Sequence, residues 1–79
     1  MLAASDPQDG DIVIRQDARD GKLVFVLHTV PGADQFILQT RDAAIAQAAA
    51  FAKRQGVRVW LSNGDGEFAL VEDFRVASV

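Results

Sequence analysis

Hydrophobic and polar residues alternate along five short segments of the chain, as they do in β-strands that turn one face toward a core. The segments are rich in β-branched and aromatic residues, which favour strands. Polar stretches that contain glycine separate them, and Asn63-Gly64-Asp65-Gly66 is typical of a hairpin turn. The pattern predicts strands over residues 12–16, 22–30, 35–39, 57–62 and 67–71.

Between the third and fourth strands the pattern changes to that of an α-helix. Seven of the ten residues from 43 to 52 are alanine, the best helix former. Thr40 is suited to cap the start of the helix through its hydroxyl group, and Gly56 is suited to the left-handed conformation that ends it. At 100° per residue the helix has one apolar stripe, which we expect to pack against the sheet. It comprises Ile45, Ala48, Ala49 and Ala52, and it is widened by Ala44 and Phe51.

The order of these elements predicts an α+β fold. We expect an antiparallel sheet of about five strands in the order β-β-β-α-β-β, with a single helix packed on one face. Residues 1–10 are interpreted as a flexible N-terminal tail, and residues 11–79 as a single domain.

Sorting the strand residues by face gives two apolar sets, although the chain supplies only one helix to cover them. The bulkier set, expected beneath the helix, comprises Ile12, Ile14, Leu23, Phe25, Leu27, Phe36, Leu38, Val57, Val59, Leu61, Phe68 and Leu70. The opposite set comprises Val13, Arg15, Val24, Val26, His28, Ile37, Arg58, Trp60, Ala69 and Val71.

A sheet face in water normally carries polar residues, and a large exposed apolar patch usually marks an interface. We therefore predict a non-catalytic binding or assembly module that forms a homodimer through the face opposite the helix. Val24, Val26 and Trp60 would be the anchors of this interface, with Arg58 and Arg15 at its rim. The alanine side of the helix is the alternative surface for self-association, and another protein is the alternative partner.

The composition of the chain indicates which class of protein it belongs to and in which compartment we expect it. The chain has 79 residues, a net charge of −3 and no cysteine, and 49% of its residues are hydrophobic. These values are typical of a folded domain without disulfides, and the abundance of alanine and arginine suggests a bacterial source. No apolar run approaches the roughly 20 residues that span a bilayer. We expect a cytoplasmic protein that does not associate with membranes.

Candidate catalytic chemistry is sparse. His28 is the only histidine, and the chain has neither cysteine nor tyrosine. A catalytic histidine needs an orienting partner and a nucleophile, and a metal site needs further ligands. We predict that the protein is not an enzyme and has no catalytic, cofactor-binding or metal-binding residues.

An alternative function is the binding of single-stranded nucleic acid. Arg58 and Trp60 lie two residues apart on one predicted strand and share a face with Arg15 and His28. An aromatic ring beside arginines on an open sheet is the arrangement on which several such proteins stack bases. The net negative charge opposes this function, because nucleic-acid-binding surfaces are normally basic.

The order of motifs from Ile12 to Phe74 resembles a family of small bacterial proteins known only as a domain of unknown function. The resemblance rests on the segments IVIRQDARDGKLVFVL, TRDAAIAQAAAFAKRQG and VRVWLSNGDGEF. It covers Thr40 before the helix, Gly56 after it and the Asp65-Gly66 turn. The resemblance implies a strand-rich fold with one helix, and it assigns neither an activity nor functional residues.

Overall fold

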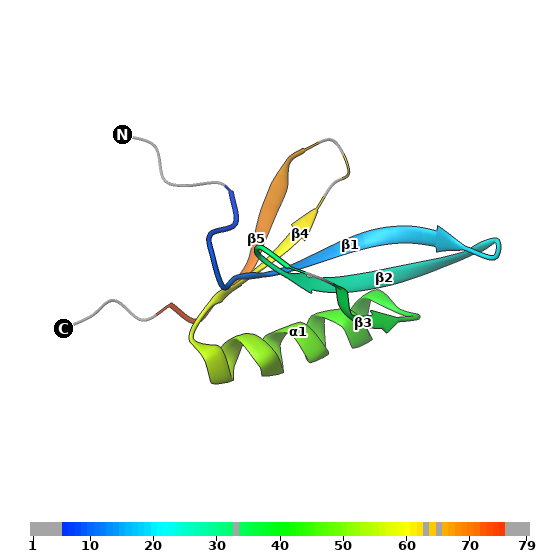
Figure 1. Ribbon diagram of the computed structural model, residues 1–79. Helices are drawn as coiled ribbons and strands as arrows, with labels where there is room; N and C mark the ends of the chain where they lie inside the picture. The colour runs from blue at the N-terminus through cyan, green and yellow to red at the C-terminus, as the bar shows by residue number, and fades with distance from the viewer. Residues whose placement is uncertain (1–5, 33, 63, 65, 76–79) are drawn as a thin grey trace.

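The computed structural model describes residues 6–32, 34–62, 64 and 66–75, and they form one sheet with a helix on one of its faces (Figure 1). The elements are β1 (Ile12–Arg19), β2 (Lys22–Thr29), β3 (Asp34–Leu38), α1 (Arg41–Gln55), β4 (Arg58–Ser62) and β5 (Phe68–Asp73). The predicted α+β fold, with five strands and one helix in the order β-β-β-α-β-β, is confirmed. Two residues of the predicted Asn63–Gly66 turn, Asn63 and Asp65, lie outside the described residues.

The sheet is mixed, with the strand order β3-β2-β1-β4-β5. The pairs β1–β2, β2–β3 and β4–β5 are antiparallel, as we expected, whereas β1 and β4 are parallel. The parallel pair follows from the helix. Because α1 carries the chain back along the sheet, β4 starts at the end where β1 and β3 start. The prediction of a purely antiparallel sheet was wrong on this point.

Local interactions define both ends of α1. The Thr40 hydroxyl oxygen accepts a hydrogen bond of 3.1 Å from the backbone amide of Ala43, and Gly56 closes the helix at φ 69° and ψ 43°. Asp42 lies in the first turn, and Lys53 and Arg54 lie in the last, where each charge suits the helix dipole. The predicted caps of the helix are confirmed.

The core lies between α1 and the sheet. On the helix side it consists of Ala44, Ala48 and Ala52, which are fully buried. The sheet contributes the buried residues Ile12, Ile14, Phe25, Leu27, Val57 and Val59. Small side chains on the helix let it lie close to the larger side chains of the sheet.

The faces of β5 differ from the prediction. The register next to the turn places Leu70 opposite Trp60 and Phe68 opposite Ser62, and a bulge between Val59 and Trp60 shifts only the pairs beyond Leu70. Cross-strand partners share a face, and Phe68 and Leu70 therefore lie on the face opposite α1 rather than beneath the helix. Val71, which we placed on the opposite face, packs against the core.

The boundary of the N-terminal tail also differs from the prediction. The amide of Gly10 donates a hydrogen bond of 2.6 Å to the carbonyl oxygen of Val30, and the amide of Asp11 donates one of 2.9 Å to Gln8. Gly10 adopts a φ of 94°, a conformation that favours glycine, as the chain enters the sheet. Residues 8–10 are thus part of the folded domain, whereas residues 1–5 of the predicted tail lie outside the described residues.

Among the described residues, no helix combines the length and the hydropathy needed to cross a membrane.

The close packing of α1 generates a test of the core. We expect Ala48→Leu to lower the free energy of unfolding by about 1–3 kcal/mol, because the larger side chain overfills a fully buried position. Ala46→Leu is the matched control, since Ala46 is exposed on the same helix. Urea unfolding followed by circular dichroism measures both changes. Equal stability of the two variants would contradict the packing described here.

Candidate functional site

The sheet face opposite α1 is apolar at its centre and bounded by other parts of the same chain. The β4–β5 pair and the segment that leads into β1 both rise on this side of the β1–β2 hairpin (Figure 1). In the centre of the face, Val13 lies beside Trp60 on one side and His28 on the other. Val13, Val26 and Trp60 are all buried within the single chain. The face is therefore partly covered without a second helix.

This burial corrects our choice of interface anchors. The exposed fractions of Val26 and Trp60 are 0% and 2%, so neither side chain is at the surface where a partner could contact it. Val24, Arg58 and Arg15, the other three predicted interface residues, are half-buried. The apolar side chains of this face that do reach solvent belong to the two edge strands, β3 and β5. They are Ile37, which is 49% exposed, and Leu70, which is 50% exposed.

The residues proposed for nucleic-acid binding are only partly brought together. Arg15 and His28 line one hollow of about 350 Å³, together with Val13, Val30 and Phe68. Trp60 is absent from its lining and is buried, so its ring offers no face on which a base could stack. The Nε of Arg58 lies 3.1 Å from a carboxylate oxygen of Asp73, in an ion pair within the chain. His28 Nδ1 lies 3.2 Å from the carbonyl oxygen of Thr29.

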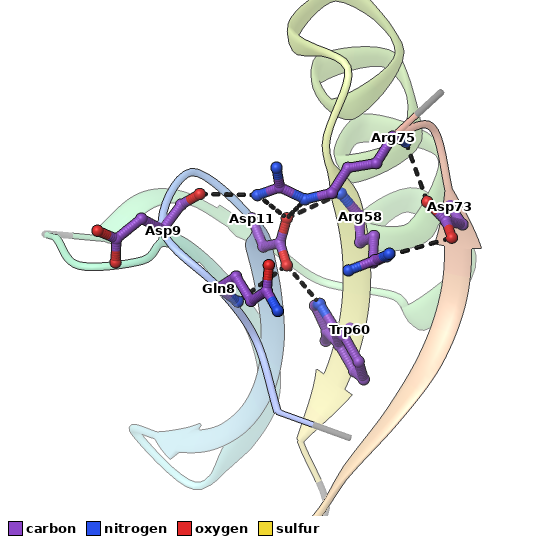
Figure 2. Close-up of polar contacts among 7 residues, drawn as sticks. All are labelled: Gln8, Asp9, Asp11, Arg58, Trp60, Asp73 and Arg75. Atoms are coloured by element: carbon purple, nitrogen blue, oxygen red, sulfur yellow. Dashed lines mark hydrogen bonds and ion pairs between the residues drawn. The ribbon is translucent and has the colours of Figure 1, made fainter. Parts of the chain in front are cut away.

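Trp60 is held in place by Asp11, the one fully buried charged residue in the described part of the chain (Figure 2). One carboxylate oxygen of Asp11, Oδ2, accepts a hydrogen bond of 2.9 Å from the indole Nε1 of Trp60. The same oxygen accepts one of 3.0 Å from the backbone amide of Gln8. These bonds join the segment before β1 to β4.

The other carboxylate oxygen, Oδ1, joins Asp11 to β4 and to the end of the described chain. It accepts hydrogen bonds of 3.0 Å from the backbone amide of Arg58 and from Nε of Arg75, and it lies 2.8 Å from Nη2 of Arg75. Arg75 also donates from Nη2 to the carbonyl oxygen of Asp9 at 2.7 Å (Figure 2). We call this group (Gln8, Asp11, Arg58, Trp60 and Arg75) the Asp11 clasp.

The electrostatics of the clasp favour the charged form of Asp11. Burial by itself raises the pKa of a carboxyl group. The hydrogen bonds from Gln8, Arg58, Trp60 and Arg75 outweigh burial, and together they lower the pKa of Asp11 below its ordinary value. The pKa of Asp73 is lowered as well, mainly by the backbone amide of Arg75 and then by the side chain of Arg58. Both carboxylates are therefore ionised at neutral pH.

The clasp is a structural arrangement rather than a reactive one. Both oxygens of Asp11 are occupied by protein donors, so that neither is available to accept a proton from a substrate or to bind a metal ion. In the ranges that the structure describes, no three His, Cys, Asp or Glu residues are grouped as metal ligands would be.

Sequence reasoning missed Asp11 and Arg75. Two signals pointed to Asp11. It stands directly before the apolar run Ile12-Val13-Ile14, and the only tryptophan of the chain needs an acceptor for its indole N–H when buried. Neither signal identifies the partner, because Trp60 is 49 residues away from Asp11.

Comparison of the chain with protein-family models, curated proteins and solved structures finds no match. The resemblance to a bacterial domain of unknown function therefore stays a prediction.

The Asp11 clasp predicts that replacing the Asp11 carboxylate by an amide of similar size strongly lowers the stability of the fold. Asp11→Asn removes the charge that pairs with Arg75 and places an amide group among hydrogen-bond donors. We expect the free energy of unfolding to fall by about 2–4 kcal/mol, because the partners are left buried and incompletely paired. Asp9→Asn is the matched control, since the exposed Asp9 contributes its backbone carbonyl, and we expect a change within about 0.5 kcal/mol. Chemical denaturation at pH 7 measures both, and similar values would contradict the role of the Asp11 carboxylate.

The lowered pKa of Asp11 also predicts how stability depends on pH. An aspartate whose pKa is lower in the folded state contributes stability that is fully present above the unfolded-chain value of about 3.9. This contribution is lost as the pH falls through the lower, folded value. We therefore expect the stability difference between the wild type and Asp11→Asn to be constant above roughly pH 5 and to shrink as the pH falls below about 4. A difference that does not change with pH would show that ionisation of Asp11 is not its source.

Proposed function

We propose that this chain is a non-catalytic binding and assembly module that associates with a second copy of itself. The proposal includes a bacterial, cytoplasmic setting, which rests on composition. The contact surface comprises the apolar side chains that remain exposed on the sheet face opposite α1. The observation that carries the proposal is the exposure of Ile37 and Leu70, about half of each side chain, at the two edges of a face that is apolar throughout its centre.

Exposed apolar residues scattered singly are common on soluble proteins, whereas interfaces combine them with further apolar surface. Ile37 and Leu70 lie at opposite edges of the sheet, and the side chains between them on this face, Val26, Val13 and Trp60, are apolar and buried. Ile37 lies opposite the buried Val26, and Leu70 lies opposite the buried Trp60. Phe68 is half-buried on the same face and lines the hollow next to Val13. Contact with a partner would remove this apolar surface from water and would extend the existing apolar face.

The non-catalytic part of the proposal rests on how the buried polar groups are used. In the part of the chain that the structure describes, no buried side-chain nitrogen or oxygen lacks a hydrogen-bond partner. Enzyme sites commonly keep polar groups poised for a substrate. Here both oxygens of the buried Asp11 carboxylate accept hydrogen bonds from other residues of the same chain.

The experiment is a measurement of solution mass against concentration. We expect a monomer at about 10 µM and an increasing share of dimer toward about 1 mM, because an interface made from a few exposed side chains is small. Ile37→Lys should weaken the association about tenfold or more. The added lysine changes the net charge from −3 to −2, which reduces the repulsion between copies. A loss of dimer therefore cannot be attributed to net charge.

Ala46→Lys is the matched control, because it introduces the same charge at an exposed position of the helix. Dimerisation that is lost in Ala46→Lys and kept in Ile37→Lys would place the contact on the alanine side of α1 and contradict the proposed surface. A wild type that stays monomeric at every concentration would contradict self-association itself.

The dependence on salt concentration distinguishes self-association from the binding of nucleic acid. Two chains of net charge −3 repel one another, and salt screens this repulsion. We expect self-association to strengthen between roughly 50 mM and 300 mM salt, whereas binding to an oligonucleotide through phosphate contacts weakens as salt increases. Sedimentation equilibrium and fluorescence anisotropy with a labelled oligonucleotide measure the two processes. Oligonucleotide binding at low salt would support the alternative and contradict the proposed function.

A further inference from the structure

The hollow of about 350 Å³ on the face opposite α1 lies where the strands β1 and β4 part. The two strands pair only over residues 12–14 of β1, although β1 continues to Arg19. Beyond this parallel pair, the β4–β5 pair rises away from the β1–β2 hairpin (Figure 1). The topology of the sheet therefore leaves a space between the two pairs of strands. The described residues that line it are Asp6, Pro7, Val13, Arg15, His28, Val30, Ser62 and Phe68.

Much of this lining is apolar. Val13 lies in the centre of the sheet face and is buried, and Val30 and Phe68 are half-buried. Val30 follows β2, whereas Phe68 begins β5, so the two side chains come from opposite sides of β1 and β4. Binding sites for small molecules are typically apolar hollows of about 300–1,000 Å³ that hold a few polar groups. The hollow fits this description at the small end of the range.

Two opposite charges border the same apolar surface. Arg15 contributes a guanidinium group and Asp6 a carboxylate, and Ser62 adds a hydroxyl group. A guanidinium group binds a carboxylate through two parallel N–H donors, and its five donors allow it to do so while it keeps other partners. A carboxylate accepts hydrogen bonds from an ammonium group. A ligand that complements this lining therefore carries both charges on one small apolar body.

We infer that the hollow binds a free α-amino acid with an apolar side chain. The carboxylate of the ligand pairs with Arg15 and its ammonium group pairs with Asp6. Its side chain lies against Val13 and Phe68. Each charge of the ligand then meets an opposite charge, and the complex keeps the net charge of −3, whereas a simple anion would add to it. The inference goes beyond the proposed self-association and does not rest on it, because the hollow lies within one chain.

Titration with L-phenylalanine, followed by NMR of the isotope-labelled protein, tests the inference directly. We expect saturable shifts of the signals of the lining residues with a Kd of about 1 mM, because so small a ligand supplies little binding energy. Glycine carries the same two charges without the apolar side chain, and we expect it to bind at least about tenfold more weakly. Lining signals that do not shift at about 20 mM L-phenylalanine would overturn the inference.

Two analogues test the charges of the ligand separately. L-phenylalanine amide lacks the carboxylate, and we expect it to bind about tenfold more weakly, because it loses the charged hydrogen bonds to the half-buried Arg15. N-acetyl-L-phenylalanine lacks the ammonium group. We expect a loss of about threefold for it, because Asp6 is exposed to water. If both analogues bind as tightly as L-phenylalanine, the hollow recognises apolar groups only, and the assignment of an amino acid is overturned.

A pair of variants tests the role of Arg15 in the chain. We expect Arg15→Gln to weaken the binding of L-phenylalanine about tenfold, because the partner of its carboxylate is removed. Arg19→Gln is the matched control, since Arg19 lies on the same strand but does not line the hollow, and both variants lose one positive charge. We expect this control to bind as the wild type does, with circular dichroism showing that both variants are folded. An equal loss in the two variants would show an effect of net charge alone and overturn the assignment of Arg15.

Discussion

The arrangement of this protein depends on one buried carboxylate. Asp11 accepts hydrogen bonds from Gln8 and Arg58 amides, from the Trp60 indole and from the Arg75 guanidinium group. A buried charge is costly unless its oxygens are paired, and here both oxygens are. These bonds bring together the segment before β1, the start of β4 and the segment after β5. They also fix Trp60 inside the chain, and thereby determine which apolar residues remain at the surface.

The burial of Trp60 by the Asp11 clasp determines which surface is left for the proposed function. The alanine face of α1 covers one side of the sheet, and the clasp closes much of the other side around Val13 and Trp60. The large apolar side chains that stay exposed in the described residues are Phe36 and Ile37 of β3, Leu70 of β5 and Leu23 at the start of β2. On the proposed function, a surface with so few exposed apolar residues would bind its partner weakly and reversibly.

The sequence predicted what is determined locally. Thr40 and Gly56 mark the ends of the helix because each residue acts on backbone groups within a few positions of itself. The alternation along residues 12–16 and 22–30 correctly separated the two faces of β1 and β2. In β5 we assigned Phe68 and Leu70 to the wrong face, because alternation separates two faces without showing which one meets the helix. That choice depends on the pairing register with β4, in which Leu70 lies opposite Trp60.

Interactions between distant segments were not predictable in this way. The parallel pairing of β1 with β4 follows from how α1 crosses the sheet, and Asp11 meets Arg58 and Arg75 across 47 and 64 residues. Trp60 was correctly placed on the face opposite α1, but its burial depends on partners that a residue pattern does not specify. For this reason, the prediction that Val26 and Trp60 lie at the surface of this face was wrong.

The fluorescence of Trp60, the only tryptophan of the chain, tests this account most directly. Its accessibility to acrylamide is measured at about 10 µM, where we propose that the chain is monomeric, and again at about 1 mM, where we propose that it associates. The account predicts a blue-shifted emission and weak quenching under both conditions, because the ring is buried within one chain. Strong quenching in dilute protein that is lost on association would show that Trp60 is covered by a partner, and would contradict the account.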